Sequence, residues 1–239
     1  SEMCIRDRAK ELHVAPEVPR GVFVIRQLNG GDAALMDVVQ GLFPDRQNDF
    51  VLSVGDSDVA LIHQLPETGS EKEIQRAAGV LENALCAEGE KRVVIGIGTV
   101  ALHLRELAKS YKEAQIAIEV GKVFDTEKYV INYENLGIGR LIYQLPTTLC
   151  EMFLMEVFKK NPIDALDQET LFTIHKFFEN NLNVSETARK LFVHRNTLVY
   201  RLEKIKKLTG LDLREFDDAI TFKVALMVKK YLTSRGIDA

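Results

Sequence analysis

Residues 183–210 read NVSETARKLFVHRNTLVYRLEKIKKLTG and predict two helices joined by a short turn. Asn183 and Ser185 are both suited to cap the first helix, because a short side-chain oxygen accepts hydrogen bonds from unpaired backbone N–H groups. The turn falls at residues 192–194. Gly210 supplies the stop of the second helix, since glycine adopts the left-handed conformation common at helix ends.

Apolar and polar residues separate onto opposite faces of the two helices. The inner face holds Ala188 and Leu191 in the first helix and Leu198, Leu202 and Ile205 in the second. This spacing is typical of a buried helical stripe. The outer face of the second helix collects Asn196, Tyr200, Glu203 and Lys207, flanked by Arg195 and Arg201. The second helix therefore has a polar edge with cationic borders, suited to the major groove of DNA.

Charge distinguishes this unit from an ordinary helical hairpin. Residues 185–207 hold seven Lys/Arg against two Glu, although the whole chain has a net charge of −4. Residues 167–239 have a net charge of +3 and residues 1–166 a net charge of −7. A local cationic excess favours binding to phosphate. The alternative is a basic helix that is merely solvated.

The same residues resemble a known family. The run Asn183, Ser185, Thr187-Ala188, residues 191–198, residues 200–202 and residues 208–213 is similar to the C-terminal helix-turn-helix of PucR/CdaR-type regulators, the purine-catabolism and sugar-diacid activators. The resemblance covers about the last seventy residues. Many such turns place glycine where this chain has Phe192, because glycine tolerates a positive φ. In this family the position is usually bulky.

Two groups of side chains are expected to contact DNA. Those expected to read base edges are His194, Arg195, Asn196 and Tyr200. Those expected to meet phosphate are Ser185, Thr187, Thr197, Arg201, Lys204 and Lys207. Arginine can donate two hydrogen bonds to guanine, and asparagine can pair with adenine. One unit reads few bases, so we expect a homodimer on half-sites ~34 Å apart in double-stranded DNA.

The central part of the chain is predicted to form an α+β ferredoxin-like domain. The all-α helix-turn-helix domain follows it. Strands are expected at residues 21–27, 50–54, 58–63, 92–98 and 129–133, and helices at residues 31–42, 71–87 and 103–120. The first of these helices should bury Leu35, Val38, Val39 and Leu42, and the second Ile74, Ala77, Ala78, Leu81 and Leu85. The glycines Gly96 and Gly98 are expected to let a helix pack close to their strand.

This part resembles, more loosely, the degenerate GGDEF-like domain that precedes the helix-turn-helix in the same family. The residues that carry the resemblance are Ile95-Gly96-Ile97-Gly98, Leu107, Ser110-Tyr111, Glu113-Ala114 and residues 133–137. Cyclases of this fold bear a Gly-Gly-Asp/Glu-Glu-Phe hairpin, whereas this chain has Gly55-Asp56-Ser57-Asp58. A plain turn is favoured over a metal or nucleotide site, because Asp and Ser also suit turns. A nucleotide-binding or cyclase-like sensor remains the alternative function.

No catalytic residues, metal ligands or cofactor are predicted. The five histidines show no metal-ligand spacing, and only His194 has a special position. Residues 29–32 (NGGD) indicate a strand-to-helix turn and not a phosphate cradle. Three scattered cysteines and the lack of a long apolar run indicate a reducing cytoplasm and no membrane contact.

The expected domain organisation has four parts. They are a non-native leader at residues 1–8, the GGDEF-like domain at 9–136, a helical connector at 137–166 and the DNA-binding domain at 167–239. The connector holds a Met- and Phe-rich helix at 147–160, which could pack within the chain or on a second chain. The last domain opens with a helix at 167–181 that should bury Leu171, Ile174, Phe177 and Phe178. It closes with one at 216–232 whose broad apolar face could complete the core or carry a dimer contact and should hold Phe216, Ile220, Val224, Met227, Val228 and Tyr231.

The resemblance also implies an effector. In the family, a region N-terminal to the part present here senses the ligand. We therefore expect a transcriptional regulator, an activator of a catabolic operon, that responds to a small metabolite bound by that region.

Overall fold

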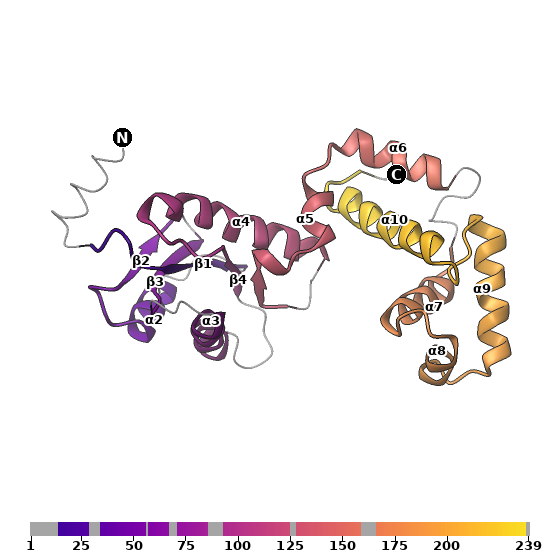
Figure 1. Cartoon of the computed structure of the whole chain (residues 1–239), viewed down its shortest axis with the longest axis horizontal. Coiled ribbons are helices and arrows are strands. Elements are labelled where there is room, and N and C mark those ends of the chain that lie inside the picture. The colour runs from indigo at the N-terminus through magenta and orange to yellow at the C-terminus, as the bar shows by residue number, and fades with distance from the viewer. Residues whose placement is uncertain are drawn as a thin grey trace. The chain divides into compact units, whose positions relative to one another are not determined.

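The computed structural model describes residues 14–28, 34–55, 57–66, 71–85, 93–124, 128–158 and 166–237. It forms two compact units that meet in the sequence between Arg140 and Leu141 (Figure 1). Several predictions concern residues outside the described ranges. They are the leader at 1–8, the turn at 29–32, His13, Cys4, Cys86, Asp56 and the last two residues of the helix expected at 147–160.

A five-stranded sheet forms the centre of the first unit. Its strands are β1 (Arg20–Gln27), β2 (Asp49–Ser53), β3 (Asp58–Gln64), β4 (Val93–Ile97) and β5 (Val130–Asn132), in the order β2-β3-β1-β4-β5. Strand β1 lies antiparallel to both β3 and β4, and only β5 pairs in parallel, with β4. The first four strands have the order of a ferredoxin-like sheet, so the predicted α+β class is confirmed.

Helices cover both faces of this sheet. Helices α2 (Ala34–Leu42) and α3 (Glu71–Leu85) lie on one face, and α4 (Leu107–Phe124), which follows the short 3₁₀ helix η2 (Leu104–Glu106), lies on the other (Figure 1). The core under α2 and α3 contains Phe23, Ile25, Leu61, Leu81 and Ile95, all completely buried. The prediction that Val38 points inward was wrong, because this side chain is 40% exposed. Its neighbour Val39, which was also predicted to point inward, lies in the core.

The glycines of β4 explain how α4 lies so close to the sheet. A Cβ atom placed on Gly96 would lie 2.0 Å from the carbonyl oxygen of Ala114, and one placed on Gly98 would lie 2.0 Å from that of Ser110. Both distances are far below any tolerated contact. The backbone of the helix therefore rests directly on the strand, as the sequence predicted for these glycines.

The second unit is helical. Its elements are α6 (Thr147–Val157), α7 (Gln168–Glu179), α8 (Val184–Lys190), α9 (Arg195–Thr209) and α10 (Phe216–Ser234), while the 3₁₀ helix η3 (Tyr133–Asn135) and α5 (Ile138–Tyr143) precede α6. The buried side of α6 holds Cys150 and Leu154 and packs against α10. Phe158, just after α6, meets Phe222 edge-to-face with ring centroids 5.6 Å apart.

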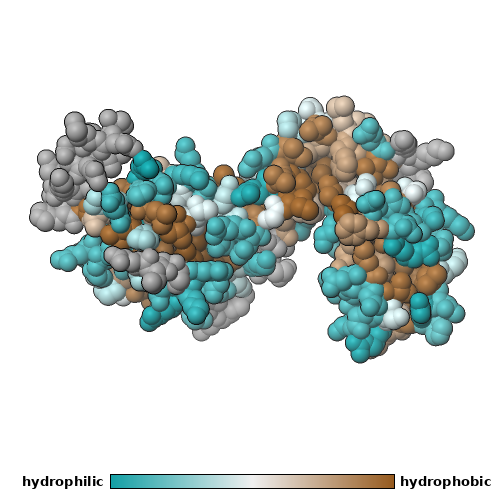
Figure 2. Space-filling model, in the orientation of Figure 1, coloured by the Kyte–Doolittle hydropathy of each residue, from teal (hydrophilic) through white to brown (hydrophobic). Residues whose placement is uncertain are grey.

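The other side of α6 is exposed. Figure 2 shows hydrophobic residues at the surface around α5 and α6, where Leu141, Leu149, Met152 and Met155 are 48–67% exposed. The apolar side chains of the predicted connector thus divide between packing within the second unit and exposure. Of the described helices, none is long and apolar enough to span a membrane.

The apolar face predicted for α10 is only partly buried. Phe216 and Ile220 are 70% and 44% exposed, and Val224 and Met227 are half-buried. The buried residues are Ala219, Phe222, Ala225, Val228, Tyr231 and Leu232. The buried face is centred on Phe222, because α6 packs against α10 from that side. The spacing of apolar residues within α10 could not predict which helix it would pack against.

Candidate nucleic-acid interface

The turn between α8 and α9 has the conformation of a helix-turn-helix. The Asn183 side chain accepts the backbone N–H of Glu186 at 3.0 Å and caps α8, as predicted. At the other end of α8 the N–H of Val193 donates to the carbonyl of Ala188 at 3.0 Å. Phe192, the residue before Val193, adopts φ +56°, the left-handed value that favours glycine. Its side chain is 96% exposed.

Helix α9 begins and ends where the sequence predicts. His194 is its N-cap, and its Nδ1 accepts the backbone N–H of Asn196 at 3.3 Å. Gly210 ends the helix with φ +83°. Leu198, Leu202 and Ile205 are at most 1% exposed, which confirms the predicted buried stripe.

The buried stripe of α9 faces two other helices. Helices α7 and α8 both pack against α9. Ile174 and Phe177 of α7 are completely buried, while Leu171 and Phe178, also predicted to be inside, are half-buried. This core fixes which side of α9 faces solvent.

The side chains predicted to read bases lie at the exposed N-terminal half of α9. His194, Arg195, Asn196 and Tyr200 are all exposed, and the exposed fraction of Tyr200 is 72%. Within the described ranges, no side chain forms an ion pair or hydrogen bond with those of Arg195, Asn196 or Tyr200. The structure thus brings the four residues to one end of one helix, with donors and acceptors directed away from the core.

The residues predicted to meet phosphate fall into two groups. Ser185, Thr197, Lys204 and Lys207 are exposed; the Lys204 ammonium lies 3.5 Å from the Asp167 carboxylate. Thr187 is completely buried, and its hydroxyl donates to the Asn183 carbonyl at 2.7 Å. The prediction of a phosphate contact for Thr187 was therefore wrong, because its hydroxyl stabilises the first turn of α8.

Arg201 also differs from the prediction. Its guanidinium donates to the Thr173 hydroxyl at 3.3 Å and pairs with the Glu169 carboxylate at 2.5 Å, and its side chain is only 27% exposed. Both partners belong to α7. Arg201 thus ties α9 to α7, and these two contacts occupy part of its guanidinium.

An ion-pair network neutralises the one acidic side chain on the outer face of α9. Arg214 donates to Glu203 and also to both carboxylate oxygens of Asp212, at 2.8 and 2.7 Å. Lys206 lies 3.1 Å from Asp212. The hydrogen bonds from Arg214 hold the pKa of Asp212 well below its usual range, and Asp212 in turn raises the pKa of Arg214. The Arg214 guanidinium therefore balances the negative charge of Glu203.

Sequence reasoning missed the roles of two cations. Arg214 pairs with Glu203 across the turn after α9, and no helical spacing connects these positions. Lys190 is exposed at the end of α8, and among the residues that the structure describes none pairs with it. The charge count over residues 185–207 contained Lys190 but did not single it out.

The hairpin of the first unit has no comparable site in its described part. Both carboxylate oxygens of Asp58 accept hydrogen bonds from Arg26, at 2.9 and 2.8 Å, and Arg26 also pairs with Glu119. His63 lies 2.7 Å from Asp49. Among the described residues, no three His, Cys, Asp or Glu side chains gather as metal ligands would. Asp58 therefore serves an ion pair between β1, β3 and α4.

Comparison with family models gives a match for each unit. Residues 1–120 match the model of the GGDEF-like domain, and residues 170–228 match that of the PucR C-terminal helix-turn-helix domain. The second match begins inside α7 and ends inside α10, so it contains α8, α9 and every exposed residue predicted to contact DNA.

Curated relatives match over different lengths. The chain is 26% identical to the purine catabolism regulatory protein of Bacillus subtilis over 64% of this chain and 29% of that protein. It is 32% identical to the carbohydrate diacid regulator of Escherichia coli over 59% and 36% of the two chains. The proline-responsive transcriptional activator PutR of B. subtilis is 25% identical over 96% of this chain and 58% of its own length. The chain thus spans between about a third and three fifths of these relatives.

Proposed function

Because the chain belongs to the PucR/CdaR family of regulators, with a GGDEF-like domain followed by the PucR C-terminal helix-turn-helix, we propose that it regulates transcription by reading DNA with α9. The observation that supports this function best is the exposed end of α9, where Arg195, Asn196 and Tyr200 have no partner among the described residues. Arginine and asparagine at the start of a helix suit guanine and adenine edges in the major groove.

The proposed interface has a specific part and a general part. His194, Arg195, Asn196 and Tyr200 contact base edges. Ser185, Lys190, Thr197, Lys204 and Lys207 contact phosphate and set the register of the protein on the duplex. Two copies bind half-sites one helical turn apart, because one α9 reads few bases. Nuclease footprinting tests this copy number, since one continuous site without a repeat contradicts it.

The regulatory context is an inference from the family. Each of the three relatives has a name that describes a regulator, and the names mention purine catabolism, a carbohydrate diacid and proline. We infer an activator of a catabolic operon in the cytoplasm that responds to a small metabolite. An enzymatic function is disfavoured, because these names describe regulators and Asp58 of the hairpin is held by Arg26.

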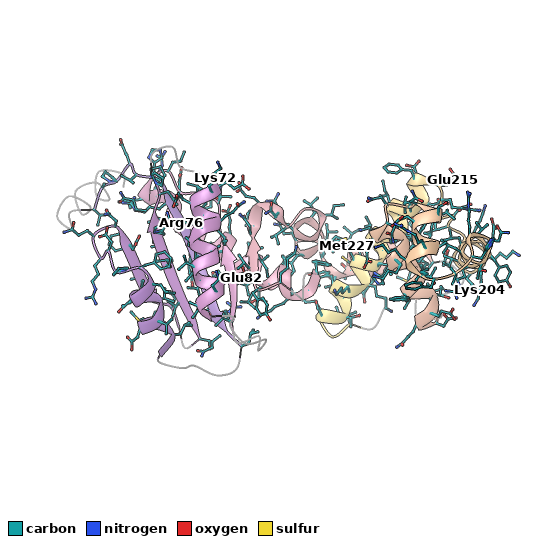
Figure 3. All side chains as sticks on the ribbon, turned by 90° about the horizontal axis from the view of Figure 1, so that it is seen from below. Lys72, Arg76, Glu82, Lys204, Glu215 and Met227 are labelled. Atoms are coloured by element: carbon teal, nitrogen blue, oxygen red, sulfur yellow. The ribbon has the colours of Figure 1, made fainter. Side chains whose placement is uncertain are left out.

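Two substitutions in α9 test the DNA interface, each with a matched control on α3 of the first unit. Figure 3 shows Lys204 in the second unit and the controls Lys72 and Arg76 on α3. Arg195→Ala should reduce discrimination between a selected duplex and a random one by about 1–3 kcal/mol. Lys204→Ala should weaken both duplexes alike and flatten the salt dependence by about one unit of slope.

Fluorescence anisotropy at several salt concentrations measures both effects. Arg76→Ala and Lys72→Ala should bind both duplexes as the parent protein does. The proposed function fails if Arg195→Ala and Lys204→Ala also bind like the parent, or if the α3 controls lose as much affinity as the α9 variants.

A further inference from the structure

A groove of about 370 Å³ lies in the first unit, between α3 and the edge strand β5. Ile74, Ala78 and Ile97 form its floor and are at most 6% exposed. Its size falls in the range of small-molecule pockets, which are about 300–1,000 Å³ in volume. None of the proposed DNA contacts belongs to this unit, so DNA binding does not account for the groove.

Gly79 widens the groove at the middle of α3. A glycine inside a helix is destabilising relative to alanine, because it loses more backbone freedom on folding. At Gly96 and Gly98 close packing compensates for that loss, but a Cβ atom placed on Gly79 meets no atom within 4 Å. Packing within the described chain therefore does not require glycine at this position. Because glycine has no side chain, Gly79 leaves space in the wall of the groove.

Polar groups of opposite charge line the two walls. The wall formed by α3 carries the carboxylates of Glu71 and Glu82, and Gln75 donates to Glu71 at 3.2 Å. In Figure 3, Glu82 and Arg76 lie on opposite edges of α3. Glu82 is half-buried, and no residue in the described ranges pairs with it.

The facing wall follows β5 and η3. It carries the Lys128 ammonium and the side-chain amides of Asn132 and Asn135. The Asn132 oxygen already accepts the N–H of Glu134 at 2.9 Å, which leaves its amide N–H groups to act as donors. The amide donors of this wall suit a carboxylate, and Lys128, which also interacts within the protein, adds positive charge beside them.

These features together select a class of ligand. The Glu82 carboxylate binds an ammonium group, the amides beside Lys128 bind a carboxylate, and the buried floor accommodates a hydrocarbon body. We propose that the groove binds a small zwitterion with an apolar body, such as an α-amino acid with an aliphatic side chain. This proposal does not depend on the DNA interface.

Nuclear magnetic resonance of the ¹⁵N-labelled 239-residue chain tests the proposal with L-leucine as the probe. Leucine should shift the amide resonances of Gly79 and Asn132 saturably, with a Kd of about 1 mM, as expected for so small a ligand. Two analogues separate the walls: 4-methylpentanoate lacks the ammonium and 3-methylbutylamine lacks the carboxylate. Each should bind about tenfold more weakly or worse. Absence of saturable shifts in the groove, or equal binding of all three compounds, overturns the proposal.

A matched pair of glycine substitutions locates the binding. Gly79→Leu fills the groove and should weaken leucine binding about tenfold or more. Gly41→Leu is its control, because Gly41 also lies in a helix, α2, and also faces open space, but does not line the groove. Gly79→Ala, which needs no rearrangement, should give an intermediate loss. Leucine binding that survives Gly79→Leu, or that falls equally in Gly41→Leu, contradicts the assignment to this groove.

Discussion

Phe192 occupies an unfavourable backbone conformation without any packing in return. Its φ of +56° is in the left-handed region, and its side chain is 96% exposed. A side chain with a Cβ atom costs about 1–2 kcal/mol there relative to the usual helical region. The ring therefore contributes little to the stability of the fold that holds it.

Phe192→Gly should stabilise the second unit by about 0.5–1 kcal/mol, because relief of backbone strain exceeds the greater freedom that glycine gives the unfolded chain. Hydrogen exchange of the α9 amides measures this change in the full chain. Phe192→Ala is the control, since it removes the ring but keeps the Cβ atom, and it should leave the exchange free energy close to that of the parent. A glycine variant that is less stable than the alanine variant contradicts the strain argument.

Single residues also show where prediction from sequence stops. The spacing of Leu198, Leu202 and Ile205 was enough to place Arg195, Asn196 and Tyr200 on the exposed face of α9. The same spacing could not predict that Arg201 faces α7, because that depends on how two helices cross. Nor could it predict that the Thr187 hydroxyl bonds within its own helix.

At the scale of elements, the contact between β4 and α4 depends on the absence of side-chain atoms. Gly96 and Gly98 allow the carbonyl oxygens of Ala114 and Ser110 to approach the strand. The contact is reinforced at the end of β4, where Glu113 accepts the backbone N–H of Thr99 at 3.1 Å and Ser110 donates to the Thr99 carbonyl at 2.6 Å. Strand and helix thus pack in a single register.

Gly96→Ala should destabilise the first unit by about 2–4 kcal/mol, because the new methyl group forces α4 away from the sheet. Urea unfolding followed by circular dichroism measures the loss. Gly41→Ala in α2 is the matched control: its methyl group meets no atom within 4 Å, and the unit should become more stable by about 0.5 kcal/mol. Equal effects of the two substitutions would show that close packing at Gly96 is unimportant.

Element types were easier to predict than the faces that elements bury. The sheet strands follow from runs of β-branched residues such as those in β1 and β4, and their observed ends lie within two residues of the expected ones. The buried face of α2 was predicted less accurately, as Val38 shows, and the apolar face expected for α10 is only partly buried, as Phe216 shows. Both helices are apolar on more than one side, so only the position of their neighbours decides which side is buried.

At the scale of the whole molecule, each unit has its own buried aromatic centre. Phe23 is completely buried in the first unit and Phe177 in the second. Net charge divides the sequence into a negative part, residues 1–166, and a positive part, residues 167–239. The observed change of unit at Arg140/Leu141 directly follows Gly137 and Gly139 and lies close to residue 136, the expected end of the GGDEF-like domain.

Phe23→Ala and Phe177→Ala should therefore have separable effects, each costing about 3–5 kcal/mol in its own unit. Hydrogen exchange read by mass spectrometry reports on both units in one experiment. Phe23→Ala should accelerate exchange in β1 and β3 but leave α9 protected and DNA affinity unchanged. Phe177→Ala should do the reverse. If either substitution loosens both units equally, they do not fold independently.

The close packing of β4 and α4 limits where two related proteins can be joined to make a new regulator. A hybrid made from two related proteins would need to take this strand and this helix from the same parent, since a methyl group at Gly96 or Gly98 would prevent them from meeting. A crossover between Arg140 and Leu141 leaves that pair intact and transfers α9 with its supporting helices. That junction is the natural place to exchange one DNA specificity for another.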